Sequence, residues 1–470
     1  MERMISIIIN MISGLFLIPQ PAFAQQNSPI DQELLALKAD SILEVSVGIQ
    51  EHMGITAGIM SDGELLWKNG AGWSDEDANI PAEADMVHRI ASISKPMTSI
   101  AILQLYEQGK IDLDAPIHTY IPEYPKHEKG TFTVRQLLTH TSGTNHYKGG
   151  TDGFSIKNYP TLDDAMKRFW ERKLVSEPGT DYRYTTYGYV VLGVVIERVS
   201  GMEYEAYMKK HVWEPAGMMN TSIERKGVKV ANASRLYKRT DKGELKKDLK
   251  TNLSMKTPGG GILSTVNDLL KFGQAILDNT LIKAETLELM TTRSGLKKQG
   301  NPYGMGWFLY KDENDRRGRI IGHSGSQSGT SSQLMILRDA KIVVAVMSNT
   351  RRAWEELFMT SWNLINRSFS AEDLQAPIKQ VVALNDSDMD RFLGTYDFGQ
   401  GQIMKITRKG DQLYSQMNKY PPMMLYPESK KVIAYRAFDA YFDFEFDANG
   451  AVSKTTYWQN GQEILPKKID

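Results

Sequence analysis

The stretch His88-Arg89-Ile90-Ala91-Ser92-Ile93-Ser94-Lys95 determines how the rest of this sequence is interpreted. It begins as a short strand-like run and leads into apolar residues that recur at helical spacing between residues 97 and 105. Pro96 is tolerated only in the first turn of a helix, and Gly109 suits the position just past the helix end. The pattern therefore predicts a helix that starts close to Ser92.

Ser92 and Lys95 are three residues apart, so on the first turn of that helix they share a face. A serine hydroxyl is a weak nucleophile that needs a nearby base or a local positive field. The helix N-terminus adds free N–H groups and partial positive charge, which suit a developing oxyanion. This S-x-x-K pattern is weak by itself, because Ser294-Gly295-Leu296-Lys297 repeats it in a polar loop, which we interpret as chance.

A candidate partner is Tyr184 in the run Tyr184-Thr185-Thr186, which comes just before an apolar helix expected over residues 188–199. The unperturbed pKa of a tyrosine is near 10, too high for a base at neutral pH. A cationic neighbour such as Lys95 would lower the pKa of Tyr184, because opposite charge favours the phenolate. Considered alone, Tyr184 is better interpreted as one of 21 tyrosines, packed in a core with its hydroxyl satisfied.

The second candidate cluster is Gly322-His323-Ser324-Gly325-Ser326, on or at the edge of a predicted strand. His323 can donate a hydrogen bond to a substrate carboxylate or stabilise a tyrosinate. Gly325 lets a substrate backbone approach the strand. The Ser326 N–H is a candidate second oxyanion donor beside the Ser92 N–H. Considered alone, the cluster is as typical of a glycine-rich surface turn as of an active-site strand.

The hydrophobic pattern predicts an α/β (α+β) fold. A strand at residues 55–60 returns through the turn Ser61-Asp62-Gly63, and several strand-like runs follow between residues 304 and 348. Helical patterns fill the middle of the chain, and another follows over residues 353–365. We therefore expect an antiparallel sheet assembled from both chain ends and flanked by helices.

Beyond residue 387 the chain changes character. Phe442, Phe444 and Phe446 alternate with acidic residues at a period of two, and Asn-Gly and Gly-Asp pairs mark turns. This predicts a separate antiparallel β-domain, a sandwich or small barrel, over residues 388–470. Residues 371–387 are mixed and polar and are predicted to be a linker after a main domain at 30–370.

Residues 1–24 resemble a cleaved secretory signal. Arg3 precedes a short apolar run, and the small-residue site Ala22-Phe23-Ala24 ends it. The run is shorter than the ~20 residues that a spanning helix needs, although an uncleaved membrane anchor is the alternative. The sequence therefore predicts a periplasmic or secreted protein with no stable membrane span after cleavage.

Composition excludes several classes of function. The chain has 470 residues, no cysteine, and 56 basic against 56 acidic residues. The absence of cysteine excludes disulfides, thiol nucleophiles and cysteine-bound zinc. The net charge of zero gives no overall electrostatic field to attract nucleic acid. The eight histidines form no ligand-like pattern, so no metal is expected, and no G-x-S-x-G elbow occurs. We expect no organic cofactor, and the residues predict no oligomeric state.

The three motifs Ser-x-x-Lys, Tyr-x-Thr and His-x-Gly, in this chain order, resemble those of the serine β-lactamase and penicillin-binding protein superfamily. The class C-like branch is the most similar, and supporting stretches occur at residues 89–95, 137–143, 178–180, 258–261 and 303–307. The resemblance implies that Ser92 is acylated and that Lys95 and Tyr184 share general-base and general-acid duty. It also implies that Ser326 completes the oxyanion hole. The tail resembles the lipocalin-like β-domains of some members.

Two departures from the family pattern bear on substrate. Thr186 stands where many relatives carry Asn, and His323 stands where true β-lactamases usually carry Lys. A threonine hydroxyl is shorter than an Asn amide, and His is only partly charged near neutral pH. The sequence therefore predicts a secreted serine hydrolase for a small-molecule or peptide substrate, with a D-amino-acid peptidase or esterase favoured. The alternatives are a class C-type β-lactamase and a penicillin or cell-wall-fragment sensor without turnover.

Overall fold

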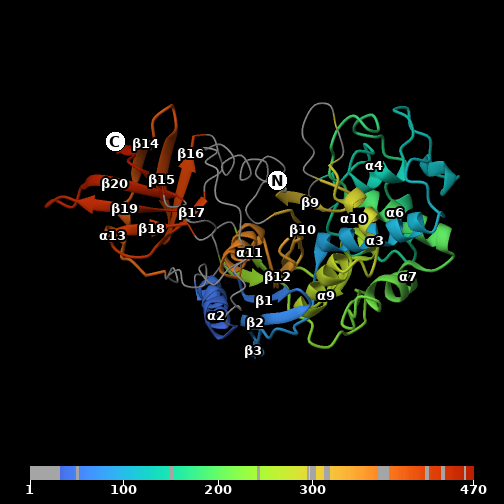
Figure 1. Cartoon of the computed structure of the whole chain (residues 1–470), viewed down its shortest axis with the longest axis horizontal. Coiled ribbons are helices and arrows are strands. Elements are labelled where there is room, and N and C mark those ends of the chain that lie inside the picture. The colour runs from blue at the N-terminus through green and yellow to red at the C-terminus, as the bar shows by residue number, and fades with distance from the viewer. Residues whose placement is uncertain are drawn as a thin grey trace. The chain divides into compact units, whose positions relative to one another are not determined.

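The computed structural model describes residues 32–48, 52–148, 152–240, 244–293, 296, 303–311, 318–368, 381–418, 423–435, 440–459 and 462–470. They form two compact units, residues 32–364 and the described part of residues 365–470, each with its own hydrophobic core (Figure 1). The predicted signal peptide and most of the predicted linker lie outside the described residues, and the predicted domain boundaries stay predictions. In the described ranges, no helix has both the length and the apolar character needed to cross a membrane.

The first unit is built on a seven-stranded antiparallel sheet in the order β3-β2-β1-β12-β11-β10-β9. Strand β1 pairs with β2 on one side and with β12 on the other, so both ends of the unit contribute to one sheet, as predicted. The strands are β1 (Gly54–Ser61), β2 (Glu64–Asp75), β3 (Ile80–Pro81), β9 (Phe308–Lys311), β10 (Ile320–Gln327), β11 (Thr330–Leu337) and β12 (Ile342–Ser348).

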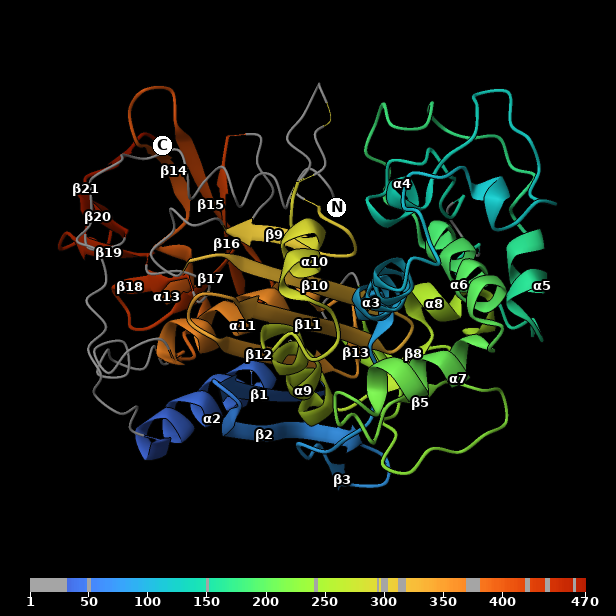
Figure 2. The same ribbon diagram turned by 45° about the vertical axis from the view of Figure 1, so that its right-hand side comes forward.

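Helices cover both faces of this sheet (Figure 2). On one face, helix α9 (Val266–Leu277) comes so close that a Cβ on Gly58 of β1 would lie 2.8 Å from Leu270. On the other face, Asp40 of helix α2 (Gln32–Gly48) accepts hydrogen bonds from Trp67 and Asn69 of β2. Alternate residues of a strand face opposite sides of the sheet. A strand with helices on both sides is therefore apolar along its whole length and not only at every second residue.

A helical region lies beside the sheet and contains most of the main core. Its central pair is α3 (Ser94–Glu107) and α6 (Thr186–Ser200), which pack against each other and against the short helix α8 (Thr257–Gly260). The others are α4 (Val134–Leu138), α5 (Leu162–Lys167), α7 (Tyr204–Met208), α10 (Ala284–Met290) and α11 (Trp354–Ser368). Two small sheets complete the unit, β4 (His88–Arg89) with β8 (Ile262–Ser264) and β5 (Ser222–Ile223), and β6 (Tyr237–Arg239) with β7 (Leu245–Lys247) and β13 (Thr350–Arg351).

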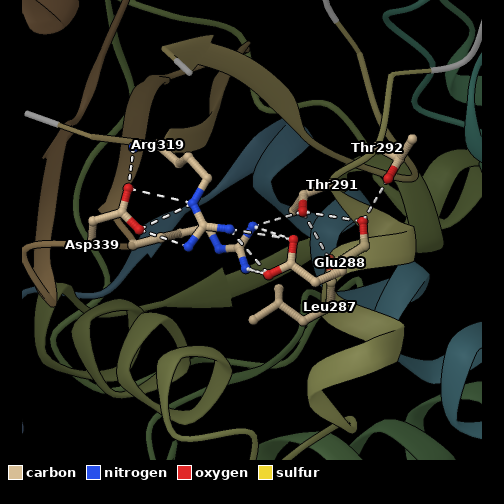
Figure 3. A network of polar contacts seen from close by, with 7 residues as sticks. Leu287, Glu288, Thr291, Thr292, Arg319 and Asp339 are labelled. Carbon is tan, nitrogen blue, oxygen red and sulfur yellow. Dashed lines mark hydrogen bonds and ion pairs between the residues drawn. The ribbon is translucent and has the colours of Figure 1, made fainter. Parts of the chain in front are cut away.

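A network of charged side chains joins α10 to one end of the main sheet (Figure 3). Arg319, which precedes β10, donates to Asp339 in the turn between β11 and β12 at 2.7 Å. Glu288 of α10 accepts from both Arg319 and Arg338. Because most of these groups are partly exposed, each pair adds little stability, and the network mainly fixes where α10 meets the sheet.

The second unit is a curled, open nine-stranded sheet, a half-barrel, in the order β21-β20-β19-β18-β17-β16-β15-β14-β22. Phe442 and Phe444 of β19 are fully buried in its core with Tyr396. Glu445, which lies between Phe444 and Phe446, is exposed, as the period-two pattern predicted. Its elements are α13 (Asp386–Asp390), β14 (Gly394–Asp397), β15 (Ile403–Lys409), β16 (Gln412–Met417), β17 (Met423–Pro427), β18 (Val432–Ala434), β19 (Ala440–Phe446), β20 (Val452–Gln459), β21 (Gln462–Ile464) and β22 (Lys467–Lys468).

Candidate active site

Ser92 lies in a one-turn 3₁₀ helix, η1 (Ala91–Ile93), which continues directly into α3 at Ser94. Ala91 has a φ of 47°, a left-handed conformation that is uncommon for residues other than glycine. The Ser94 hydroxyl donates to Ala91 O at 2.7 Å and holds this turn. Ala91 and Ile93 are buried and Ser92 is half-buried, so the turn directs a single hydroxyl outward from the core.

Lys95 is fully buried and lies within reach of Ser92. Its Nζ is 3.0 Å from Ser92 Oγ, 2.8 Å from Gly259 O and 3.3 Å from Thr186 Oγ1. Burial, followed by the positive charge of Lys256, lowers the pKa of Lys95 well below its usual range. The side chain therefore favours the neutral amine, with a lone pair that can accept a proton.

Tyr184 meets the same two residues. Its hydroxyl hydrogen-bonds the Ser92 side chain, and Lys95 Nζ lies 4.8 Å from the centre of its ring. The expectation that Lys95 lowers the pKa of Tyr184 is wrong. Burial raises the pKa above its usual value, and the hydrogen bond with Ser92 opposes this only in part, so Tyr184 is a neutral phenol near pH 7.

Thr186 is the first residue of α6, and it faces Lys95 because of how that helix begins. Thr185 caps the helix, since its hydroxyl accepts from the Gly188 N–H at 3.3 Å. The Thr186 hydroxyl contacts Lys95 Nζ and also hydrogen-bonds the Tyr147 hydroxyl. The substitution of Thr for Asn therefore keeps a contact with Lys95.

His323 of β10 is 1% exposed, and both its ring nitrogens have partners within the protein. Nδ1 lies 2.6 Å from Ser324 O, and because a carbonyl only accepts, Nδ1 carries the proton. Nε2 is then the acceptor for the Tyr303 hydroxyl at 2.9 Å. Burial lowers the pKa of His323 to about 3. The ring is neutral and has no free N–H, which does not fit the expected bond to a substrate carboxylate.

Gly325 brings β10 against the turn that carries Ser92. A Cβ at Gly325 would lie 2.5 Å from Ile90 O, 2.4 Å from Ser332 Oγ and 3.0 Å from Ala91 Cβ. Only glycine allows this approach of strand and turn. Ser326, the next residue, is exposed beside them. Its role as an oxyanion donor stays a prediction.

Several residues of this site were not predicted as part of it. His140 Nδ1 accepts from the Thr185 N–H at 3.1 Å, and His146 Nδ1 accepts from the Thr186 N–H at 3.3 Å, so both rings brace the start of α6. Gly259 O and Lys256 come from the glycine-rich stretch around α8. That stretch was noted only for its resemblance, because nothing in its local pattern indicates that a lysine is buried there.

Known proteins confirm the class to which this site belongs. The sequence model of the beta-lactamase family matches residues 39–361. The serine beta-lactamase-like protein LACTB of Mus musculus is 28% identical over 60% of this chain and 69% of its own. Esterase EstB of Burkholderia gladioli is 30% identical over 40% of this chain and 52% of its own. The octameric penicillin-binding protein homologue from Pyrococcus abyssi superimposes with a TM-score of 0.64 at 25% identity, covering 92% of this chain and 99% of that one.

The fold and the site thus define an enzyme of the serine hydrolase class. The chain belongs to the beta-lactamase family. The resemblance drawn from the three motifs is thereby confirmed, and so is the β-lactamase/transpeptidase-like fold with its all-β C-terminal unit.

Proposed function

We propose that this enzyme hydrolyses an amide, peptide or ester through a covalent ester on Ser92. The observation that carries the proposal is the contact of 3.0 Å between Lys95 Nζ and Ser92 Oγ. A neutral amine has two N–H groups and one lone pair. Gly259 O and Thr186 Oγ1 can take the two N–H groups, so the lone pair is left for the Ser92 hydroxyl proton.

The steps follow from these partners. The Ser92 proton moves to Lys95 as Oγ bonds to the substrate carbonyl carbon, and the N–H groups of Ser92 and Ser326 stabilise the oxyanion. Tyr184, a neutral phenol in contact with Ser92, delivers a proton to the leaving nitrogen or oxygen as its bond to carbon breaks, and Lys95 restores that proton. Water then attacks the ester, which releases the acid and regenerates Ser92.

A D-amino-acid peptidase or an esterase is favoured over a β-lactamase. A β-lactam carries a carboxylate that a fixed cation would bind, whereas His323 is neutral and both its nitrogens are occupied. The Thr186 hydroxyl is shorter than an Asn amide and donates less well to a substrate amide carbonyl. Similarity to an esterase over part of the chain supports the same preference.

The test compares labelling and turnover in the wild type, Ser92→Ala and Lys95→Met. A fluorophosphonate probe should label the wild type, fail to label Ser92→Ala, and label Lys95→Met at a rate at least about a hundredfold lower. Labelling that persists in Ser92→Ala would exclude this nucleophile. Nitrocefin, a D-Ala-D-Ala peptide, a D-aminoacyl anilide and p-nitrophenyl esters, assayed in parallel, then identify the substrate class, and we expect nitrocefin to be the slowest.

We also propose that the enzyme acts outside the cytoplasm. The support is the basic start, the short apolar run and the small-residue site of residues 1–24. N-terminal sequencing of the protein from its own cells should begin at Gln25. A mature protein that still begins with residue 1 would contradict cleavage and favour the uncleaved membrane anchor.

A further inference from the structure

Lys256 is a second buried lysine close to the site, and the proposed mechanism does not use it. Only 6% of the residue is exposed, and it ends the 3₁₀ turn η4 (Ser254–Lys256) directly before α8. Its Nζ donates to Gly153 O at 3.4 Å and lies 5.5 Å from the centre of the Tyr147 ring. For a cation with three donors, that is one long hydrogen bond and one ring contact among the described residues.

The short helix that follows Lys256 holds the catalytic helix in place. Pro258 O accepts from the Thr98 hydroxyl of α3 at 2.6 Å, and Gly259 O accepts from Lys95. Gly260 O accepts from the Gln327 side chain of β10 at 2.9 Å. Lys256 is also connected to Lys95 through side chains, because Tyr147 lies against Lys256 and hydrogen-bonds Thr186, which contacts Lys95.

Two arginines and one carboxylate lie around Lys256, whereas the other titratable groups around Lys95 are neutral tyrosines and histidines. Glu224, a carboxylate that interacts electrostatically with Lys256, is already engaged by Nε and Nη2 of Arg89, at 2.6 and 2.7 Å. Asp152 is likewise held by Arg168 and Arg172. The titratable and charged groups that face the two amines are Arg89, Glu224, Arg168, Tyr147 and His146 around Lys256, and Tyr184, Tyr189, His140, His146 and His323 around Lys95.

We propose that Lys256 is a positioning residue whose buried charge keeps the Lys95 amine neutral and so able to act as the base. The inference rests on the proposed function, since it concerns the base of that reaction. Lys256 does not touch the reacting atoms. It acts on Lys95 by charge repulsion. Among the described residues of the pocket, no unpaired carboxylate screens one amine from the other.

The repulsion couples the protonation of the two amines. Burial, aided by Arg89, lowers the pKa of Lys256 to about 7, and the pKa of Lys95 lies well below its usual range. As pH falls through neutrality, Lys256 takes up a proton. Its charge then opposes protonation of Lys95, which stays neutral to a lower pH than it would alone.

The test is the pH dependence of Ser92 acylation by a neutral fluorophosphonate probe in full-length Lys256→Met and Lys256→Arg. The Met variant removes the charge at similar volume, so Lys95 should protonate at higher pH. Its labelling rate should fall at least about tenfold below the wild type on the acid limb, and match it within about twofold near pH 9, where wild-type Lys256 is itself neutral. The Arg variant keeps the charge and should retain the wild-type acid limb or extend it to lower pH.

The control is Lys271→Met, which removes a lysine that likewise donates to one carbonyl, Gly217 O at 3.0 Å, but on α9. It should not move the acid limb. A Met variant whose rate falls by the same factor at every pH, or an Arg variant that behaves like Met, would overturn the role of Lys256. If Met does not fold, Lys256→Gln gives the same comparison. Failure of the underlying mechanism is recognised separately, because Lys95→Met would then still acylate and no variant would alter the acid limb.

Discussion

Three side chains converge at the nucleophile, and each is defined by what surrounds it. Ser92 is half-buried at the start of α3, Lys95 is fully buried, and the Tyr184 hydroxyl reaches Ser92 while its ring lies next to the Lys95 amine. Burial favours the neutral form of both titratable groups, which raises the pKa of the phenol and lowers that of the amine. An amine that accepts a proton and a phenol that donates one are thus produced by the same low-dielectric pocket.

Replacing Tyr184 by Phe tests the role of the phenol. The ring keeps its shape and its contact with Lys95, but the proton donor is lost, so the rate of substrate turnover should fall by about 10²- to 10⁴-fold. Tyr207→Phe is the matched control, because that hydroxyl is also in a buried region but lies 3.5 Å from Gln104, away from Ser92. A Tyr184→Phe enzyme with turnover near that of the control would remove Tyr184 from the proposed proton path.

At this scale the sequence predicted what depends on local spacing. Ser92 and Lys95 could be paired because residues three apart share a helix face. Tyr184, Thr186 and His323 came from a family resemblance, since nothing local distinguishes one of 21 tyrosines. The pKa direction of Tyr184 and the bonding of His323 depend on burial and on Tyr303, and no sequence pattern reports either.

Among the elements, the close contact between β10 and η1 decides the geometry of the site. The strand can approach the turn only because residue 325 lacks a side chain, and the turn itself includes Ala91 with positive φ. Strain of this kind persists where surrounding structure enforces it. Here the enforcing contacts are Ile90 O, which accepts from the Ser332 hydroxyl at 2.8 Å, and Ala91 O, which accepts from Ser94.

The substitution Gly325→Ala should separate strand and turn. Its Cβ meets the backbone oxygen of Ile90, which cannot rotate away, so the fit costs about 1–3 kcal/mol of unfolding free energy. Acylation of Ser92 should fall at least about tenfold, because small displacements of reacting groups are expensive. Unfolding in urea and probe labelling measure the two effects. Gly109→Ala, where no atom lies within 4 Å but φ is +68°, controls for glycine loss away from the site.

The sequence anticipated long elements better than short ones. The apolar periods of β1, β11, β12, α6 and α9 are strong enough to be recognised alone. Strands of two or three residues, such as β4, β5 and β13, carry no period, and each exists only because distant segments supply its partner. The start of α3 was expected near Ser92, and the 3₁₀ turn that precedes it could not be distinguished from an α-helical turn by composition.

At the scale of the whole molecule, the histidines link stability to pH. His88, His140 and His323 are buried in the first unit, and His146 is half-buried there. Burial lowers the pKa of His88, His146 and His323 to about 3 and that of His140 well below the usual value. In the unfolded chain they would titrate near 6.5. Between those limits the unfolded state binds more protons than the folded state.

The first unit should therefore lose stability as pH falls from about 6.5 toward 3. Each histidine contributes up to about 1.4 kcal/mol per pH unit in this window, with its contribution fully present only above the unfolded pKa. The urea midpoint, followed by tryptophan fluorescence, should drop clearly between about pH 7 and about pH 5. An unchanged midpoint would show that these rings are charged in the folded enzyme.

The two cores predict separate responses to mutation. Phe442 is fully buried in the C-terminal half-barrel, and Phe272 is fully buried in the core of the first unit. Truncation to Ala should cost about 3–5 kcal/mol in the unit concerned. In calorimetry, Phe442→Ala should lower one transition and leave Ser92 labelling intact, whereas Phe272→Ala should lower the other. A single transition shifted equally by both would contradict two cooperative units.

The pairing of β1 with β12 has a consequence for synthesis. The Ser348 hydroxyl donates to Gly54 O, a contact between residues 294 positions apart. A nascent chain emerging from the ribosome cannot form this central pairing until nearly the whole first unit has been translated, and such high contact order slows folding afterwards. The reactive site at Ser92 needs β10 packed against its turn, so it arises only after nearly the whole first unit has left the ribosome.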